Sequence, residues 1–182
     1  MSTRMSKYAA FLRAVNLGPT RKASSADLRT LFEELGFEDV ETFRTSGNVV
    51  FEAGPKPASG QIEKGLAALV GGEVPVFLRT EKQIRALAPQ EPFPPKLVES
   101  SNGKLQVVLL STKPTAKVRK DVLALATDED RLAFGDRELY WLPSGGIRDA
   151  ALNFRAIEKL VGPSTMRTKG TIEQLAAKYF SL

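Results

Sequence analysis

Seven residues near the start of the chain carry the groups that proteins use to bind anions. Guanidinium and ammonium groups form charge-assisted hydrogen bonds with phosphate or carboxylate, and amides and hydroxyls add oriented donors. The residues fall in two short stretches, one at the end of the first predicted strand and in the loop after it, and one around a predicted hairpin turn. They predict a site for a small anion or a nucleotide. The candidates are Arg13, Asn16, Arg21, Lys22, Arg44, Ser46 and Asn48.

The 182 residues include no histidine and no cysteine. Zinc sites built on imidazole and thiolate, Ser-His-Asp and Cys-His nucleophiles, iron–sulfur clusters and disulfides are therefore excluded. A general acid or base would have to be a carboxylate, a lysine or a tyrosine, and spacing identifies none. The run 128–130 (Asp-Glu-Asp) lacks the spaced ligands of a calcium loop and is expected to be a solvated loop. No metal site, cofactor or catalytic residue is predicted, and enzymatic activity stays undecided.

The composition is that of a basic globular protein. Lysine and arginine number 26 against 21 acidic residues, which gives a net charge of +5 and a pI near 9.5. This balance favours anionic partners, and a basic protein without a nucleic-acid role is favoured over a nucleic-acid-binding one. Neither a signal peptide nor an apolar run long enough to span a bilayer is found, so we expect a cytoplasmic protein with no membrane contact. Oligomeric state is not predicted.

Hydrophobic periodicity predicts the same order of elements twice, strand-helix-strand-strand-helix-strand. Gly36 is a predicted helix C-cap, and hairpin turns are predicted at Ser46-Gly47 and Gly135-Asp136. The fold class is therefore α+β with two ferredoxin-like halves, each an antiparallel sheet with helices on one face. The predicted segments of the first half are strand 7–15, helix 25–35, strands 40–45 and 48–53, helix 60–70 and strand 74–79.

The second half follows a short helix near 81–88 and a proline-rich stretch that cannot continue a helix or a central strand. We therefore expect halves at 1–88 and 104–182, joined by a connector at 89–103. The second half ends in a weak strand and an extra C-terminal helix, which Thr171 is expected to cap. Its predicted segments are strand 104–111, helix 116–126, strands 130–135 and 138–142, helix 150–161, strand 165–167 and helix 172–180.

The predicted strand order of the first half, 4-1-3-2, gathers the anion candidates at one edge of the sheet. The end of the first strand, the second-to-third strand turn and the start of the first helix meet there. Ser24 and Asp27 fit a helix N-cap, and exposed N–H groups at a helix start favour anions. The alternative is that Asn16 and Asn48 only hold turns. Arg79 ends the fourth strand, so it is expected at the opposite edge as a solvated or ion-paired side chain.

Other features carry weaker alternatives. Phe11 and Phe51 occupy the first and third strands, where RNA-recognition sheets stack bases, but the paired aromatic signature is absent and burial between the halves is favoured. Lys113, Lys117, Arg119 and Lys120 are expected to form a solvated basic face, and 144–148 a flexible glycine loop. Single-stranded nucleic-acid binding, action on a phosphorylated small molecule and a non-catalytic protein-interaction role all stay open.

Ordered motifs along nearly the whole chain resemble a known family. They are Phe11–Gly18, Thr45–Phe51, Pro75–Thr80, Glu91–Pro94, Gly135-Asp136, Pro143–Ile147 and Met166–Thr168. Together they are similar to domain-of-unknown-function family 1697. The resemblance implies a bacterial protein of two α+β halves and implies no activity. The chain departs from the family pattern at 14–19, where two glycine positions are lost, and at 167–171, where a tryptophan and two asparagines are replaced.

Overall fold

The computed structural model describes residues 4–13, 23–44, 47–57 and 59–181. The chain forms two compact units, Met1–Leu87 with Leu175–Leu182, and Ala88–Gln174. The end of the C-terminal helix therefore groups with the first unit, and the expected connector groups with the second. Each unit contains a four-stranded antiparallel sheet with helices, which confirms the predicted α+β class. Within the described residues, no helix is long and apolar enough to cross a membrane.

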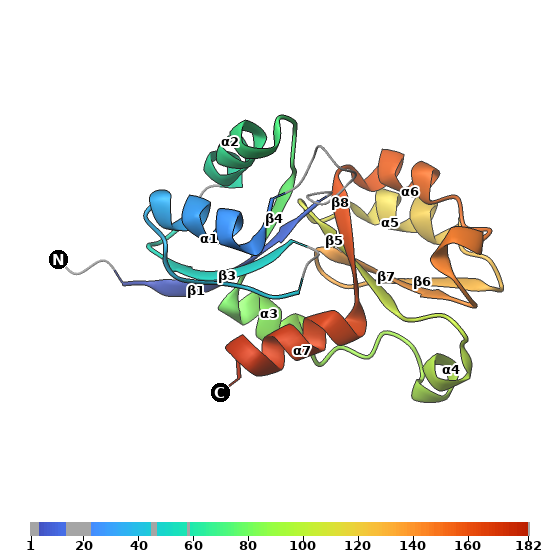
Figure 1. Ribbon diagram of the computed structural model, residues 1–182. Coiled ribbons are helices and arrows are strands. Elements are labelled where there is room, and N and C mark those ends of the chain that lie inside the picture. The colour runs from blue at the N-terminus through green and yellow to red at the C-terminus, as the bar shows by residue number, and fades with distance from the viewer. Residues whose placement is uncertain (1–3, 14–22, 45–46, 58, 182) are drawn as a thin grey trace. The chain divides into compact units, whose positions relative to one another are not determined.

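The first unit follows the predicted order of elements. These are β1 (Ser6–Leu12), α1 (Ser25–Glu34), β2 (Glu38–Thr42), β3 (Asn48–Ala53), α2 (Ser59–Val70), β4 (Val76–Thr80) and α3 (Glu81–Leu87). The sheet order is β2-β3-β1-β4, which confirms the predicted 4-1-3-2 arrangement. Ala9 in the central strand β1 pairs with Val50 of β3 and with Arg79 of β4. Figure 1 shows α1 and α2 over one face of this sheet.

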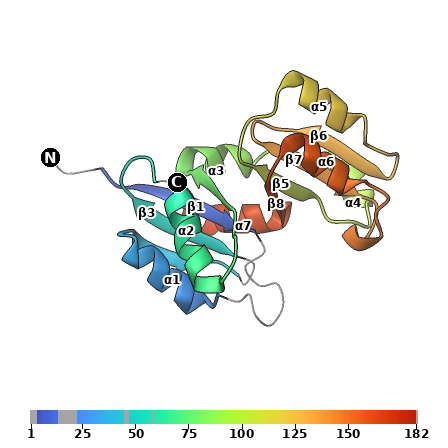
Figure 2. The same ribbon diagram turned by 90° about the horizontal axis from the view of Figure 1, so that it is seen from above.

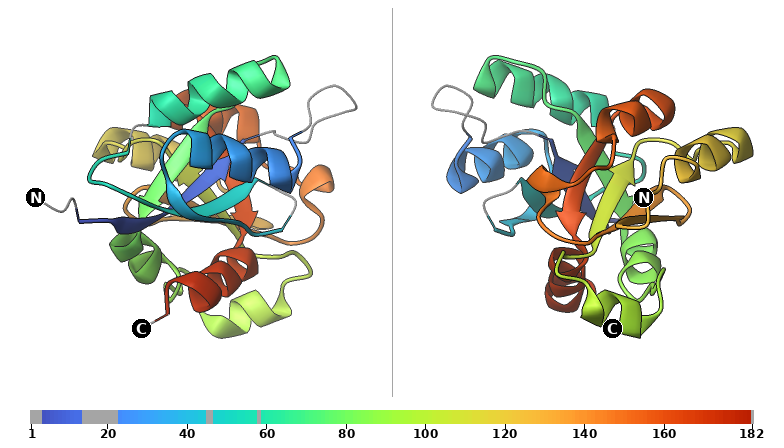
Figure 3. Two further views of the ribbon diagram at one scale, coloured as in Figure 1. Left: turned by 60° about the vertical axis from the view of Figure 1, so that its left-hand side comes forward. Right: turned by 90° about the vertical axis from the view of Figure 1, so that its right-hand side faces the viewer.

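Side-chain alternation along the strands decides which residues meet those helices. Phe51 lies on the helix-covered face, and its ring centroid is 4.6 Å from that of Phe37 and 5.3 Å from that of Phe32. Helix α3 lies across the opposite face, as Figure 3 shows. The buried core on the helix-covered face includes Ala10, Leu12, Leu28, Phe32, Val49, Phe51, Ile62 and Leu66.

Local signals fix the two ends of α1. The Ser24 hydroxyl accepts the Asp27 N–H at 3.0 Å, and the Asp27 carboxylate accepts the Ser24 N–H at 3.0 Å. This reciprocal capping box confirms the predicted helix start. Hydrogen bonding of the Asp27 carboxyl to the backbone N–H of Ser24, and secondly to the Ser24 side chain, holds its pKa below the usual value, so the group is ionised at neutral pH. The helix ends at Glu34 with Leu35 as its C-cap, and Gly36 follows with a φ of +89°, the conformation that favours glycine.

The second unit repeats this arrangement with the sheet order β6-β7-β5-β8. Helices α5 and α6 cover one face together (Figure 2), packing Val122 and Ile157 against Val108 and Leu110. Its elements are α4 (Pro95–Ser100), β5 (Gln106–Leu110), α5 (Ala116–Leu123), β6 (Asp130–Phe134), β7 (Glu138–Pro143), a 3-10 turn η1 (Ile147–Asp149), α6 (Phe154–Val161), β8 (Ser164–Thr168) and the first part of α7 (Lys169–Tyr179).

Three helices of the second unit begin where the prediction does not place a helix start. Helix α4 lies inside the expected connector, because Pro95 occupies the first helical position, where its missing N–H costs nothing. Helix α6 begins at Phe154, where the Asn153 side chain caps it, so the glycine loop leads into a 3-10 turn instead. Helix α7 begins three residues early, because the hydroxyl of Thr168 accepts the Thr171 N–H at 3.2 Å. Thr168, and not Thr171, is therefore the cap.

Asp130 is wrongly predicted as part of a solvated loop. It is 2% exposed, and its Oδ1 accepts the indole N–H of Trp141 at 3.0 Å. Its Oδ2 accepts the hydroxyl of Thr127 at 3.2 Å. A buried carboxylate is stable only with such donors, and here it satisfies the one tryptophan of the chain.

The two units share a feature beyond their element order. Strands β4 and β8 both end in Arg-Thr, and each threonine hydroxyl accepts the N–H of the third residue of the helix that follows, Gln83 at 3.1 Å and Thr171 at 3.2 Å. Arg79 and Arg167 occupy the same register. Arg79 pairs with Ala9, the fourth residue from the end of β1, and Arg167 pairs with Val107, the fourth residue from the end of β5. The repeat therefore extends to particular side chains.

Candidate functional site

Backbone hydrogen bonds join the end of β1 to the β2–β3 turn and to the residue before β4. The N–H of Leu12 donates to the carbonyl of Gly47 at 2.8 Å, and the N–H of Arg13 donates to the carbonyl of Pro75 at 3.0 Å. Gly47 has a φ of +79°, which is readily adopted only by glycine. We call this edge of the sheet, formed by Arg13 and residues 43–48, the first rim. Arg13 is half-buried there and Arg44 is exposed.

Asn48 serves the turn itself. Its side-chain N–H donates to the carbonyl of Phe43 at 2.9 Å, and its carbonyl accepts the Phe43 N–H at 2.9 Å. Asn48 is only 1% exposed. Arg44 has a φ of +59°, and its guanidinium carbon lies 5.4 Å from the Phe43 ring centroid. The amide of Asn48 is thus part of the scaffold of the first rim, as the turn-holding alternative expected.

The other four candidates lie outside the described residues: Asn16, Arg21, Lys22 and Ser46. The start of α1 contributes less to an anion site than expected, because the capping box uses the N–H groups of Ser24 and Asp27 and adds a carboxylate. Arg13 and Arg44 are therefore the described cations of the first rim.

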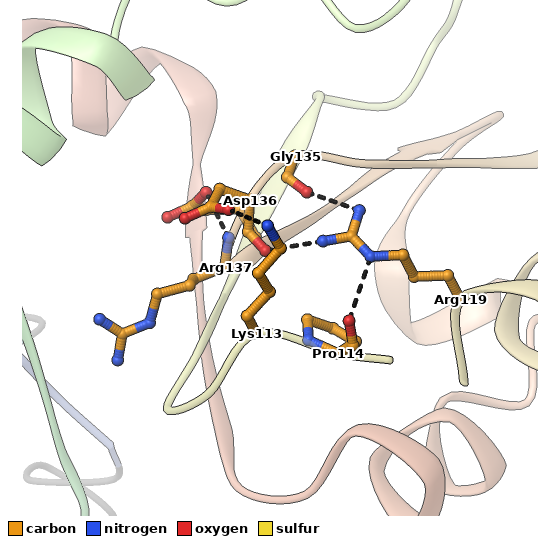
Figure 4. A network of polar contacts seen from close by, with 7 residues as sticks. Lys113, Pro114, Arg119, Gly135, Asp136 and Arg137 are labelled. Carbon is orange, nitrogen blue, oxygen red and sulfur yellow. Dashed lines mark hydrogen bonds and ion pairs between the residues drawn. The ribbon is translucent and has the colours of Figure 1, made fainter. Parts of the chain in front are cut away.

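The second unit has an equivalent rim, where the N–H of Leu110 donates to the carbonyl of Arg137 at 3.0 Å. Arg119 holds this rim together, as Figure 4 shows: its guanidinium donates to the carbonyls of Gly135 at 2.8 Å, Asp136 at 2.9 Å and Pro114 at 3.3 Å. The expectation of a solvated basic face is wrong for this residue. One planar guanidinium satisfies three carbonyls because its donors spread as a fixed fork.

The remaining cations of the second rim are also bound to protein groups. Lys113 forms an ion pair with Asp136 at 3.1 Å, and the Arg137 guanidinium donates to the carbonyl of Ser111. The loops of the first rim differ in composition. Residues 12–22 and 43–48 include four basic residues (Arg13, Arg21, Lys22 and Arg44) and no aspartate or glutamate. These two loop segments are therefore basic in composition.

Comparison with known proteins supports the motif resemblance. The model of the family described as protein of unknown function (DUF1697) matches residues 5–140, three quarters of the chain. The chain belongs to this family. The motifs at 143–147 and 166–168 lie beyond the matched residues. The conserved bacterial protein SP0830 from Streptococcus pneumoniae has a similar solved structure, with a TM-score of 0.67 and 20% sequence identity over 96% of this chain and 98% of that one. No curated protein matches.

Arg79 of this DUF1697 protein was predicted as a solvated or an ion-paired strand end, and the solvated reading is wrong. It is 1% exposed, and its guanidinium donates to the carbonyl of Leu78 at 2.9 Å, so it is not a solvated strand end. Arg167 is its counterpart, 8% exposed, and donates to Thr165 Oγ1 and to the carbonyl of Met166, both at 2.8 Å. Burial lowers the pKa of Arg167 to about 10. The repeated Arg-Thr pair was the sequence signal for these positions.

Phe11 and Phe51 do not form a surface on which bases could stack in this family member. Phe11 pairs with Asn48 and Phe77, whereas Phe51 pairs with Tyr8, and the two sets face opposite sides of the sheet. Phe11 and Phe51 are both 0% exposed, and Phe51 contacts the rings of Phe32 and Phe37. Bases cannot stack on these rings without opening the core. Burial of Phe51 is explained by α1 and α2, not by packing between the halves.

Proposed function

We propose that the first unit binds a small anion, a phosphate or the phosphate group of a nucleotide, at the first rim. The observation that carries the proposal is the 2.8 Å hydrogen bond from Leu12 to Gly47, which joins two loops that carry four basic residues and no acidic ones. The described residues of this site are Arg13 and Arg44. Asn16, Arg21, Lys22 and Ser46 enter it from the sequence alone.

The contrast between the two rims supports this reading. Both units have the same strand order and the same hydrogen bond from the central strand to the hairpin. In the second unit an aspartate and four backbone carbonyls accept from the three cations. The two loop sequences of the first rim carry four basic residues and no aspartate or glutamate, and this charge balance favours an anionic ligand.

Binding is best measured by isothermal titration calorimetry with inorganic phosphate and with ATP at low ionic strength. Arg13→Gln and Arg44→Gln should each weaken binding about tenfold, since a charge-assisted hydrogen bond contributes about 1.5–3 kcal/mol and every 1.4 kcal/mol changes affinity about tenfold. Arg155→Gln is the matched control, because it removes one exposed positive charge from the second unit. It should leave the affinity unchanged.

Two results would contradict the proposal. One is the absence of heat and of thermal stabilisation at millimolar phosphate or ATP. The other is an equal effect of the Arg155 variant, which would mean that only overall charge matters. Bound anion should also raise the melting temperature of the wild-type protein, because a ligand that binds only the folded state stabilises it.

Single-stranded nucleic acid is the alternative ligand for the same cations. Its binding would weaken steeply with salt, in proportion to the number of phosphate contacts. The buried positions of Phe11 and Phe51 favour the small anion, because stacking on aromatic side chains is the usual second component of single-strand binding. If oligonucleotides and small anions both fail to bind, a protein-interaction role without a ligand is the remaining interpretation.

A further inference from the structure

A second candidate site lies in the second unit, in a cavity of about 230 Å³ between the proline-rich segment, α4, the residue before β5 and the start of α7. Its apolar lining includes Phe93, Val98 and Leu105. The volume is below the roughly 300–1,000 Å³ of pockets for drug-sized ligands and corresponds to about eight water molecules at ~30 Å³ each. It therefore fits a ligand of about six to eight heavy atoms.

Local structure holds this cavity open. Pro94 caps α4 with extended backbone and Pro95 starts the helix, so the segment is fixed by ring geometry rather than by its contacts alone. On the other side, the N–H of Lys169 donates to the carbonyl of Leu105 at 2.8 Å. The cavity wall thus runs from a rigid proline turn to a hydrogen-bonded helix start.

Acidic residues dominate the charge of the cavity although the chain as a whole is basic. Its lining includes three glutamates, Glu91, Glu99 and Glu173, and one basic residue, Lys169. The Lys169 ammonium is committed within the protein, because it donates to Glu173 Oε1 at 2.9 Å and to the carbonyl of Ala88 at 2.6 Å. Lys169 is 6% exposed, so this pair is a fixed part of the wall.

Glu91 and Glu99 have no such partner. Neither forms a hydrogen bond or an ion pair with any of the residues that the structure describes, and both side chains are exposed at the cavity. Since Glu173 is neutralised by Lys169, the lining keeps two uncompensated negative charges beside an apolar surface. That combination is complementary to an organic cation with a short aliphatic chain and opposes a small anion.

We propose that this cavity binds an alkylammonium group, with the aliphatic part against Phe93, Val98 and Leu105 and the ammonium near Glu91 and Glu99. Such a group occurs in a free aliphatic amine and in the side chain of a lysine. The proposal is independent of the first rim, because it concerns the other unit and a ligand of opposite charge. Either site can fail without consequence for the other.

The test is a titration of the full chain, followed by NMR chemical shifts, with three probes of equal length: pentylammonium, pentanol and pentanoate. Pentylammonium should bind at least about tenfold more tightly than pentanol, and pentanoate should bind more weakly still. A lysine that is acetylated at its α-amine and amidated at its carboxyl keeps its ε-ammonium, and it distinguishes a lysine side chain from a free amine as the source of the cation. Tighter binding of the blocked lysine assigns the cation to a protein side chain, and tighter binding of pentylammonium assigns it to a free amine.

Variants locate the site. Glu91→Gln and Glu99→Gln should each weaken pentylammonium binding about three- to tenfold, as expected for partly exposed ion pairs. Glu129→Gln is the matched control, an exposed glutamate of the same unit that does not line this cavity. Val98→Phe should fill the cavity and remove binding, and an unchanged melting temperature would show that this variant is folded. Equal binding of pentanol, or unchanged affinity in both glutamine variants, would overturn the proposal.

Discussion

The buried pair of Asp130 and Trp141 offers the most direct test of how the second unit is stabilised. Both residues are 2% exposed, and the indole N–H donates to the carboxylate at 3.0 Å. Asp130→Ala leaves that N–H buried without an acceptor and also removes the acceptor of the Thr127 hydroxyl. A hydrogen bond to a charged group contributes about 1.5–3 kcal/mol, and an unsatisfied buried donor costs about 1–3 kcal/mol.

We therefore expect Asp130→Ala to lower the free energy of unfolding by about 3 kcal/mol. The melting temperature should fall by roughly 6–12 °C, since each kcal/mol corresponds to about 2–4 °C in a chain of this size. Asp130→Asn keeps an acceptor oxygen for the indole and should cost about 1 kcal/mol. Urea unfolding followed by far-ultraviolet circular dichroism measures these differences in every variant, including those without tryptophan.

A double-mutant cycle with Trp141→Phe isolates the interaction from the loss of packing. If the hydrogen bond carries the effect, Asp130→Ala should cost much less in the Trp141→Phe background, with a coupling energy of about 1.5–3 kcal/mol. A coupling energy below about 0.5 kcal/mol would refute the reasoning. It would mean that the burial of Asp130 is tolerated for some other reason than satisfaction of the indole.

Three further predictions follow from single contacts. Gly103→Ala should lower the free energy of unfolding by about 1–3 kcal/mol in urea, because its Cβ would lie 2.4 Å from the carbonyl oxygen of Pro143. Gly60→Ala is the control and should be neutral or stabilising, because a Cβ at Gly60 meets nothing within 4 Å. Arg119→Lys should lower the melting temperature nearly as much as Arg119→Ala, because an ammonium cannot satisfy three carbonyls in a fork; full rescue by lysine would contradict this. Burial and the nearby charge of Glu138 raise the pKa of Tyr140 above its ordinary value of 10.0. Stability should therefore fall as pH rises above about 10, where the unfolded tyrosine ionises and the folded one does not, and Tyr140→Phe should flatten that fall in unfolding measured across pH.

Features that depend on nearby residues were predictable from the sequence. Alternation and helical spacing predicted both sheets, and the order βαββαβ fixed the position of each strand without any knowledge of side-chain contacts. The capping box at Ser24 and the helix end at Gly36 were equally predictable, because each depends on residues three or four positions apart. The joining of the β1 end to the β2–β3 turn was predictable from the strand order, although Leu12 and Gly47 are distant in the sequence.

Features that depend on distant partners were not predictable. The solvated interpretation of Asp130 failed because its donor, Trp141, lies on the neighbouring strand. Arg119 was expected in solvent because carbonyl acceptors leave no trace in a sequence. Helix α4 was not predicted because the proline-rich segment at its start has the amino-acid composition of a linker. At the first rim, the sequence supplied the cations but could not show that Asn48 is used by the turn.

The comparison of the two units narrows where a function can lie. Strand order, the bond from the central strand to the hairpin, and the Arg-Thr pair that ends the last strand are common to both, so these features serve the fold. The rims and the cavity beside α4 are what differ. At the second rim Arg119 and Asp136 are consumed by internal contacts, whereas the loops of the first rim supply positive charge without a carboxylate. A carboxylate added to the first hairpin, like that of Asp136 in the second, therefore tests the proposal. Ser46→Asp, which places an aspartate next to Gly47 in the sequence, should abolish anion binding at the first rim and leave alkylammonium binding in the second unit unchanged.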